Sequence, residues 1–253
     1  MLIVSDVHGA FSELARVASR GGPLLVLGDL LNFVDYRTGR GIIAEVYGLE
    51  HAHEFIRNRK TGDWPANRRL WRRVSDGRES ELAERIRTEV RRQYRAARRA
   101  LIAADRAYVI HGNVDWPEEM EAALSDEVVL VDGEVVEIEG YSVGFAGGGV
   151  PTPARARGEV SREAMAAKLD ALGRVDILCT HVAPSVGPLH RDVVTGRPER
   201  SSPEVLDYLA THRPRYHYFG DIHQPEVYAW RVGRTACRNV GYFRATARAV
   251  RHG

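Results

Sequence analysis

Cysteine is scarce in this chain of 253 residues, and long apolar runs are missing from it. Cys179 and Cys237 are too few for a disulfide framework, and the apolar run around Cys179 favours a buried thiol. No apolar run approaches the length of about 18 residues that a membrane-spanning helix needs. The chain also opens on a strand pattern, without the basic and apolar region of a secretory leader. We therefore expect a cytoplasmic protein with no membrane partner.

Lysine is scarce too, since only Lys60 and Lys168 are found among the 36 lysines and arginines. The net charge is +2, yet residues 55–106 hold sixteen basic residues against seven acidic ones. That segment therefore carries +9 and the rest of the chain −7. A helix predicted from Ser80, its expected cap, to Leu101 carries many of the arginines. They form either a solvated face paired with nearby glutamates or a docking surface for nucleic acid or a polyphosphate.

A hydrophobic content of 44% and a charged content of 28% are typical of a globular protein that can bury one core. We predict a single domain over residues 1–253, with an arginine-rich, largely helical insertion over residues 35–106. His51 and His53 lie in this insertion at a spacing of two, which places them on different faces of a helix. We interpret them as ordinary side chains, with a recognition or lid role as the alternative.

Five short apolar runs each lead into polar residues of a metal-binding type. Each run predicts a buried strand, and the residues that follow the five runs are Asp6 with His8, Asp29, Asn113, His181, and Asp221 with His223. Open α/β sheets bind ligands beyond the carboxyl ends of their strands, so these side chains are expected to converge. A mixture of carboxylate, amide and imidazole ligands suits divalent ions such as Mn, Fe or Zn.

The series Asp6-x-His8, Gly28-Asp29, Gly112-Asn113, His181 and Gly220-x-x-His223 resembles the calcineurin-like metallophosphoesterases. The resemblance implies an α/β fold, a two-sheet αββα sandwich, and a metal-dependent phosphoric ester hydrolase that uses a metal-bound hydroxide. It also implies two divalent ions, with Mn expected and Fe, Zn, Co or Ni as alternatives. Carried over by position, one ion would be held by Asp6, His8, Asp29 and His223, and the second by Asp29, Asn113, His181 and Asp221. Asp29 would bridge the two ions, and Asp29 and Asn113 would be the catalytic residues.

Three positions depart from the family pattern. Asp221 stands where the family usually has His, Val114 where it often has His, and Asn32 where it often has Asp. Without the His at 114, the leaving group lacks its usual proton donor, which favours phosphodiester or nucleotide substrates over alkyl monoesters. The departures also keep open a catalytically weak or inactive binding or scaffold protein with the same fold. A nuclease that uses the basic insertion is a further alternative.

Candidate substrate contacts come from the loops. Asn32 ends the stretch Gly28-Asp29-Leu30-Leu31-Asn32, and His190 lies in the long loop over residues 182–202. Arg155 and Arg157 follow a glycine-rich loop whose counterpart lies near the site in the resembling family, which implies that they hold substrate phosphate; the alternative is that they are ordinary exposed loop arginines. His111 is expected to lie outside the metal site, and Asp115 is expected to fix its loop by hydrogen bonding.

The remaining segments give predicted elements. Helices are expected over residues 11–18, 42–56, 117–124, 161–172 and 203–210. Strands are expected over residues 128–131, 134–138, 141–145, 227–232, 235–238 and 245–250. Asp132-Gly133 predicts a hairpin turn between the first two of these strands, and residues 239–242 are expected to form a surface loop.

Overall fold

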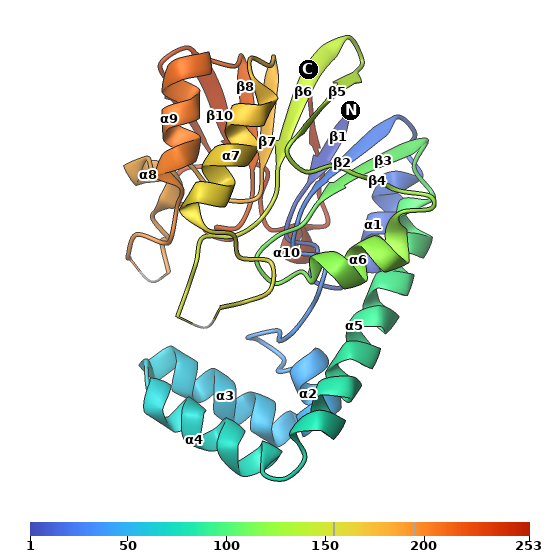
Figure 1. Cartoon of the computed structure of the whole chain (residues 1–253), viewed down its shortest axis with the longest axis vertical. Coiled ribbons are helices and arrows are strands. Elements are labelled where there is room, and N and C mark those ends of the chain that lie inside the picture. Colours follow the sequence, from blue (N-terminus) through green and yellow to red (C-terminus); the bar gives the residue numbers. More distant parts are fainter. Residues whose placement is uncertain (154, 195) are drawn as a thin grey trace.

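A computed structural model describes residues 1–153, 155–194 and 196–253 of the chain, in which two sheets face each other (Figure 1). Sheet A has the order β11-β1-β2-β3-β4, with strands β1 Leu2–Val4, β2 Pro23–Leu27, β3 Arg106–Ile110, β4 Val129–Leu130 and β11 Val250–Arg251. Sheet B has the order β5-β6-β7-β8-β10-β9, with strands β5 Glu134–Ile138, β6 Tyr141–Ala146, β7 Ile177–Thr180, β8 Tyr216–Phe219, β9 Ala229–Val232 and β10 Thr235–Asn239.

Helices cover the outer faces of both sheets. The helices of the described ranges are α1 Phe11–Ala18, α2 Ile42–Tyr47, α3 Leu49–Thr61, α4 Trp64–Ser75, α5 Glu79–Leu101, α6 Pro117–Leu124, α7 Arg162–Leu172, α8 Gly187–His190, α9 Pro203–His212 and α10 Phe243–Thr246. In Figure 1, α1, α5 and α6 lie outside sheet A, and α7 and α9 lie outside sheet B. The predicted αββα sandwich is thereby confirmed.

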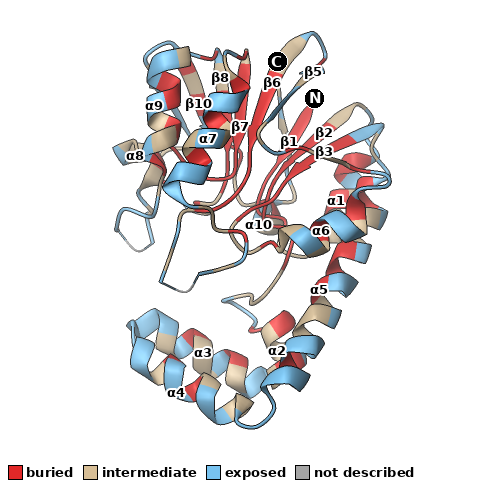
Figure 2. Ribbon diagram, in the orientation of Figure 1, coloured by how far each residue is buried: buried red, intermediate tan, exposed pale blue. Residues whose placement is uncertain are grey.

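Alternation along the strands divides the core into layers. In β1, Leu2 and Val4 pack with the helices outside sheet A, whereas Ile3 packs between the sheets with residues such as Phe145. Successive side chains of a strand point to opposite faces of the sheet, so a three-residue apolar run contributes both to the core between the sheets and to the core under the outer helices. A third cluster joins sheet B to its own helices. The sheets are consequently buried throughout their centres (Figure 2).

Parallel pairing brings the polar strand ends together. β1, β2 and β3 run parallel in sheet A, and β6, β7 and β8 run parallel in sheet B. The carboxyl ends of these strands point to one side of the molecule, toward α10 in Figure 1. The residues that follow β1, β2, β3, β7 and β8 therefore meet where the two sheets come closest to α10.

The segment between β2 and β3 is helical. The single helix expected over residues 42–56 is wrong, because Gly48, with a φ of 98°, separates α2 from α3. Helix α4 follows a break at Gly62 and was not predicted, although its Asp63 side chain accepts a hydrogen bond from the Ala66 backbone N–H as an N-cap. The expected Ser80 cap is also wrong, since α5 begins at Glu79 after Arg78. The single-domain boundary stays a prediction.

Two other local predictions are wrong. Asp132-Gly133 does not turn a hairpin, because β4 belongs to sheet A and β5 to sheet B, so this dipeptide carries the chain from one sheet to the other. Residues 245–250 contain the end of α10, a connection and the first residue of the short β11, where one long strand was expected. The other predicted helices and strands are found with shifts of a few residues at their ends. Among the helices of the described ranges, none combines the length and apolar character that a bilayer crossing requires.

Candidate metal centre

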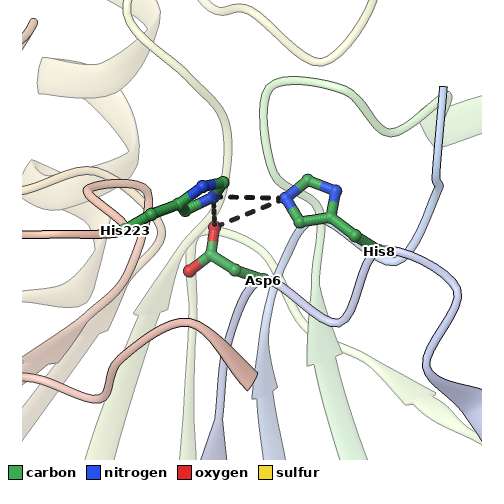
Figure 3. A group of neighbouring side chains, drawn as sticks. All are labelled: Asp6, His8 and His223. Atoms are coloured by element: carbon green, nitrogen blue, oxygen red, sulfur yellow. Dashed lines mark hydrogen bonds and ion pairs between the residues drawn. The ribbon is translucent and has the colours of Figure 1, made fainter. Parts of the chain in front are cut away.

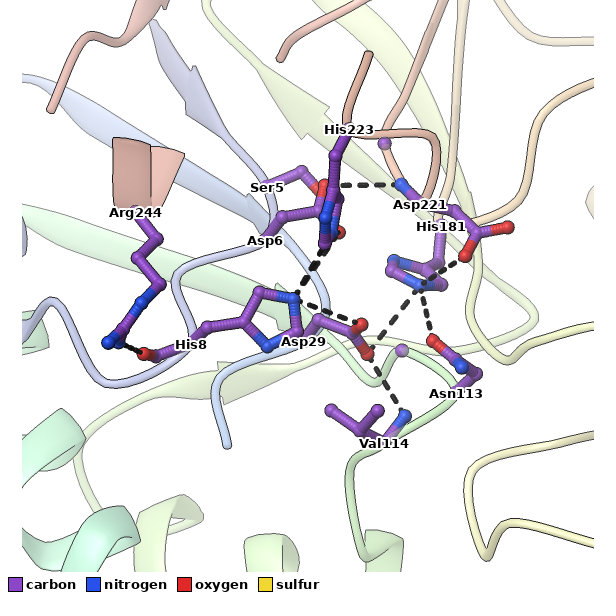
Figure 4. Close-up of polar contacts among 12 residues, drawn as sticks. Ser5, Asp6, His8, Asp29, Asn113, Val114, His181, Asp221, His223 and Arg244 are labelled. Carbon is purple, nitrogen blue, oxygen red and sulfur yellow. Dashed lines mark hydrogen bonds and ion pairs between the residues drawn. The ribbon is translucent and has the colours of Figure 1, made fainter. Parts of the chain in front are cut away.

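Seven side chains from both sheets converge at the strand ends (Figure 4). They follow β1, β2, β3, β7 and β8, and they are Asp6, His8, Asp29, Asn113, His181, Asp221 and His223. These are the seven residues that the sequence predicts as ligands. Asp29 lies in the middle, and its two carboxylate oxygens face two different groups of neighbours.

The first half of the centre contains Asp6, His8 and His223 (Figure 3). The His223 Nε2 atom lies 3.3 Å from Asp6 Oδ1 and 3.3 Å from His8 Nε2. His8 Nε2 lies 3.5 Å from Asp29 Oδ2. Atoms that bind one ion at about 2.1 Å lie roughly 3 to 4 Å from one another. These four side chains could therefore hold one ion.

The second half of the centre is built around His181. Its Nε2 atom lies 3.5 Å from Asp29 Oδ1, 3.2 Å from Asn113 Oδ1 and 3.7 Å from Asp221 Oδ1. The carboxylate of Asp221 thus occupies a ligand-like position, although it replaces the imidazole that is usual in the resembling family. The two halves share Asp29, whose Oδ1 faces His181 and whose Oδ2 faces His8.

Backbone carbonyls set the tautomers of two imidazoles. His8 Nδ1 lies 2.9 Å from the Leu31 carbonyl oxygen, and His181 Nδ1 lies 2.7 Å from the Leu27 carbonyl oxygen. In the neutral form of each imidazole, Nδ1–H donates to the carbonyl and Nε2 carries the lone pair that is directed into the centre. Such outer contacts orient the ring and raise its basicity as a ligand.

The backbone of the centre is locally constrained. Asp6, His8, Asp29 and Asp221 all have φ between 41° and 66°, a left-handed conformation that few non-glycine residues adopt. Two glycines allow close approach, because a Cβ on Gly112 would collide with the Asp29 carboxylate and one on Gly220 would collide with Ser5 Oγ. Such conformations cluster at functional sites, where the surrounding fold maintains them.

Asp115 ties two ligand-bearing loops together, as its predicted loop-fixing role requires. Its buried carboxylate accepts hydrogen bonds from the backbone N–H groups of Asp29, Leu30 and Gly112 at 2.8–3.1 Å. It also accepts one from the hydroxyl of Tyr94 in α5. Burial and the nearby Asp29 charge raise the pKa of Asp115 to about 6 against the opposing N–H donors. His111, by contrast, points to Asp132 and lies outside the centre, as expected.

The electrostatics and donor set of the centre fit divalent cations. Asp6 Oδ1 is buried without a hydrogen bond from any described residue. The Asn113 amide oxygen faces only acceptors, and reversing the amide would place its nitrogen 3.0 Å from Asp29 Oδ2. Burial opposes the charged form of His181, but the carboxylates of Asp29, Asp221 and Asp6 outweigh it and raise its pKa to about 9. Converging acceptors and excess negative charge are what a bound cation would balance.

Tyr242 and Arg244 support the centre and were missed by sequence reasoning. Tyr242 stacks on His223 with ring centroids 3.9 Å apart and an interplanar angle of 1°. Arg244 donates to the His8 carbonyl and pairs with Asp35 at 2.6 Å. The expected surface loop over residues 239–242 is therefore wrong, since Asn239 and Val240 are buried and Tyr242 packs on a candidate ligand. Neither residue follows a predicted ligand strand, so no local signal marks them.

Among the described residues, no hydrogen bond or ion pair joins the four candidate substrate residues to the seven-residue cluster. Asn32 donates to the Arg40 carbonyl at 3.4 Å, and His190 Nδ1 lies 2.8 Å from Ser201 Oγ. Arg155 is exposed. Arg157 lies over the ring of Trp116, 3.9 Å from its centroid. Only Arg157 is thus held beside the loop that carries Asn113.

Comparisons with known proteins agree with this geometry. A family model described as calcineurin-like phosphoesterase matches residues 1–225. One solved structure covers 96% of this chain and 90% of its own at 14% identity, with a TM-score of 0.63. The crystal structure of TT1561 of Thermus thermophilus covers 98% of this chain and 96% of its own at 14% identity, with a TM-score of 0.54. At these identities the two structures show the fold alone. None of the curated proteins compared with the chain matches it.

Proposed function

The chain belongs to the calcineurin-like phosphoesterase family, whose members are in general metal-dependent phosphoester hydrolases. From this premise we propose that the protein is an enzyme with two metal ions that hydrolyses phosphodiesters or nucleotides. The observation that carries the proposal is the placement of Asp29, whose Oδ1 and Oδ2 face separate sets of ligand atoms. A single carboxylate with both oxygens so placed is suited to bridge two ions. We propose Mn as the native ion, with Fe, Zn, Co or Ni as alternatives, and the cytoplasm as the location.

Bound divalent ions would polarise the phosphoryl oxygens and lower the pKa of water toward neutrality. The protein itself positions the carboxylates that would hold these ions. The Val114 backbone N–H donates to Asp29 Oδ1 at 3.0 Å, and the Asp221 backbone N–H donates to Asp6 Oδ2 at 3.1 Å. These contacts fix the central carboxylates before substrate binds, so little reorganisation is needed when charge develops.

The preference for diesters follows from position 114. The Val114 side chain packs against the core cluster outside sheet A and has no proton to donate. We propose that Arg157, held on Trp116, contacts substrate phosphate. The other proposed contacts are Asn32, Arg155 and His190.

The test is hydrolysis of a chromogenic phosphodiester by metal-stripped protein after addition of Mn. We expect metal-dependent turnover, and we expect Asp29→Ala to lower it by at least about 100-fold, because loss of outer-sphere partners alone often lowers activity by 10–100-fold. Asp170→Ala, on the exposed face of α7, is the matched control and should retain turnover. Absence of turnover with every one of the five metals, on diesters and monoesters alike, would instead support the inactive scaffold.

A further inference from the structure

The basic residues of the insertion differ in how they are paired. In α5, five arginines have carboxylate partners within 4.0 Å, and these are Arg85, Arg87, Arg91, Arg92 and Arg98. Helices α3 and α4, which together we name the α3–α4 hairpin (residues 49–75), hold seven basic and three acidic residues, a net charge of +4. Of the seven, Arg73 has an ion pair in the described chain, with Glu54. The arginine helix α5 thus has the paired face, and the hairpin has the exposed unbalanced charge.

The basic residues of the hairpin form rows along its helices. Arg57 and Lys60 are three residues apart on the face of α3 that also carries His53, and Arg68 and Arg72 are four apart on α4. All five side chains are exposed. Positive side chains in rows are suited to a ligand with regularly repeated negative charge.

The hairpin lies across from the metal centre. Figure 1 shows α3 and α4 on the side of the molecule to which the strand carboxyl ends point. His53 Nε2 lies 3.3 Å from the Thr38 carbonyl in the connector after β2. The connector is in turn held by the Asp35–Arg244 pair, and Arg244 donates to the His8 carbonyl. The α3 row that contains His53 therefore faces the segment that runs between the hairpin and the centre.

An exposed aromatic ring lies at the tip of the hairpin. Trp64 is 50% exposed, and the Arg59 guanidinium lies over its ring, 4.7 Å from the centroid. Arg68 follows Trp64 by one helical turn. A ring backed by one arginine and flanked by another offers a stacking surface beside phosphate-binding groups, which is the combination that single-stranded nucleic acids bind.

We propose that the α3–α4 hairpin binds a single strand of nucleic acid and presents one of its phosphodiesters to the metal centre. This inference rests on the proposed function and specifies its substrate class. A mononucleotide has no repeated phosphates to occupy the rows, whereas a strand supplies them along a length sufficient to reach both hairpin and centre. The seven ligand side chains would hold the metal ions at which the phosphodiester is hydrolysed, and Arg57, Lys60, Arg68 and Arg72 bind the phosphate backbone of the strand.

The test uses the full chain and a variant with Arg57→Gln, Lys60→Gln, Arg68→Gln and Arg72→Gln. Binding of fluorescent DNA and RNA strands of about 20 nucleotides is measured by anisotropy in EDTA over a series of salt concentrations. We expect the affinity of the variant to be at least about tenfold lower. We also expect the slope of log K against log salt to become shallower by about three, since each lost phosphate contact removes about 0.7. Comparison of DNA with RNA identifies the strand that is preferred.

The matched control changes four exposed arginines outside the hairpin to Gln and so removes the same amount of positive charge. These residues are Arg20, Arg95, Arg99 and Arg234. We expect oligonucleotide hydrolysis with Mn to fall at least about tenfold in kcat/KM for the hairpin variant only, with hydrolysis of the small chromogenic diester unchanged in both. Equal binding by wild type and hairpin variant, or equal loss in the control, would overturn the hairpin inference while small-diester turnover leaves the proposed function standing. Binding of the hairpin to anionic vesicles but not to oligonucleotides would also overturn it. Failure to cleave diesters and monoesters with every one of the five metals would refute the proposed function instead.

Discussion

At the level of single residues, the centre depends on side chains that do not themselves point into it. Asp115 holds the loops after β2 and β3 through backbone N–H groups on both, and Tyr94 of α5 donates to the same carboxylate. Arg244 holds the backbone of His8. The candidate ligands can remain in left-handed backbone conformations because these neighbours fix the chain on either side of them.

Tyr242 is expected to be a positioning residue for His223. Its ring stacks on the imidazole and lies 5.9 Å from the ring of His8. Tyr242→Ala should lower the affinity of the stripped protein for Mn by about tenfold, because contacts that orient a ligand commonly contribute 10–100-fold. Tyr242→Phe keeps the stacked ring and should restore most of the affinity. Metal titration by calorimetry checks both, and equal losses in the two variants would show that the hydroxyl, not the stack, is required.

His217 gives a prediction about pH. Its ring is buried in β8, and its Nε2 lies 2.9 Å from Thr180 Oγ1, whose hydroxyl donates to the Val182 carbonyl. Burial lowers the pKa of His217 to about 3 from an ordinary value of 6.5. Below pH 6.5 the unfolded chain binds a proton at this position and the folded chain does not, so stability falls as pH decreases toward 3.

The measurement is the free energy of unfolding of wild type and His217→Asn between pH 7 and pH 4. We expect the wild-type value to fall more steeply than that of the variant, by up to about 1.4 kcal/mol per pH unit, because the variant lacks the titrating group. His53→Asn, on an exposed helix face, controls for the change of side chain. Parallel pH profiles for wild type and His217→Asn would contradict the prediction.

At the level of elements, the sequence was most informative where a buried strand ends in a polar residue. Apolar runs such as 24–27 are determined locally, and the convergence of their ends follows from parallel pairing. The largest errors had non-local causes. Asp132-Gly133 has the composition of a hairpin turn, but partner choice placed β4 and β5 in different sheets. Residues 243–246 form a helix against the centre, with Phe243 buried in the core outside sheet A.

Helix α4 was predictable from its local sequence, although we did not predict it. Asp63 and Pro65 are residues typical of a helix N-cap and first turn, and both occupy those positions. Tyr242 was not predictable, because its contact with His223 is made across two loops with no shared spacing. The left-handed conformations of Asp6, His8, Asp29 and Asp221 likewise depend on the assembled sheets. Sequence reasoning therefore identified the residues that converge and missed those that hold them in place.

At the level of the whole molecule, the insertion and the sandwich share one core. Leu82, Val90 and Tyr94 of α5 pack in the same cluster as Leu2 and Val26 of sheet A. The α3–α4 hairpin joins that cluster indirectly, since Trp71 of α4 packs 5.1 Å from Tyr47 of α2, which contacts the cluster. Unfolding of the hairpin, of α5 or of the sandwich should therefore remove apolar contacts that stabilise the part packed against it.

We accordingly expect the entire chain to unfold in one cooperative transition, as the single-domain prediction requires. Two variants test it, each with one of the four tryptophans kept and the others changed to Phe: Trp71 reports on the hairpin, and Trp116 reports on the loop beside the metal centre. In urea, the fluorescence midpoints of both variants should coincide with their own circular-dichroism midpoints, which is the test of two-state behaviour. A Trp71 transition at lower urea, with Trp116 following later, would show that the hairpin unfolds by itself. The hairpin would then be a separate unit mounted on α2 and α5, and its deletion would leave the metal centre folded.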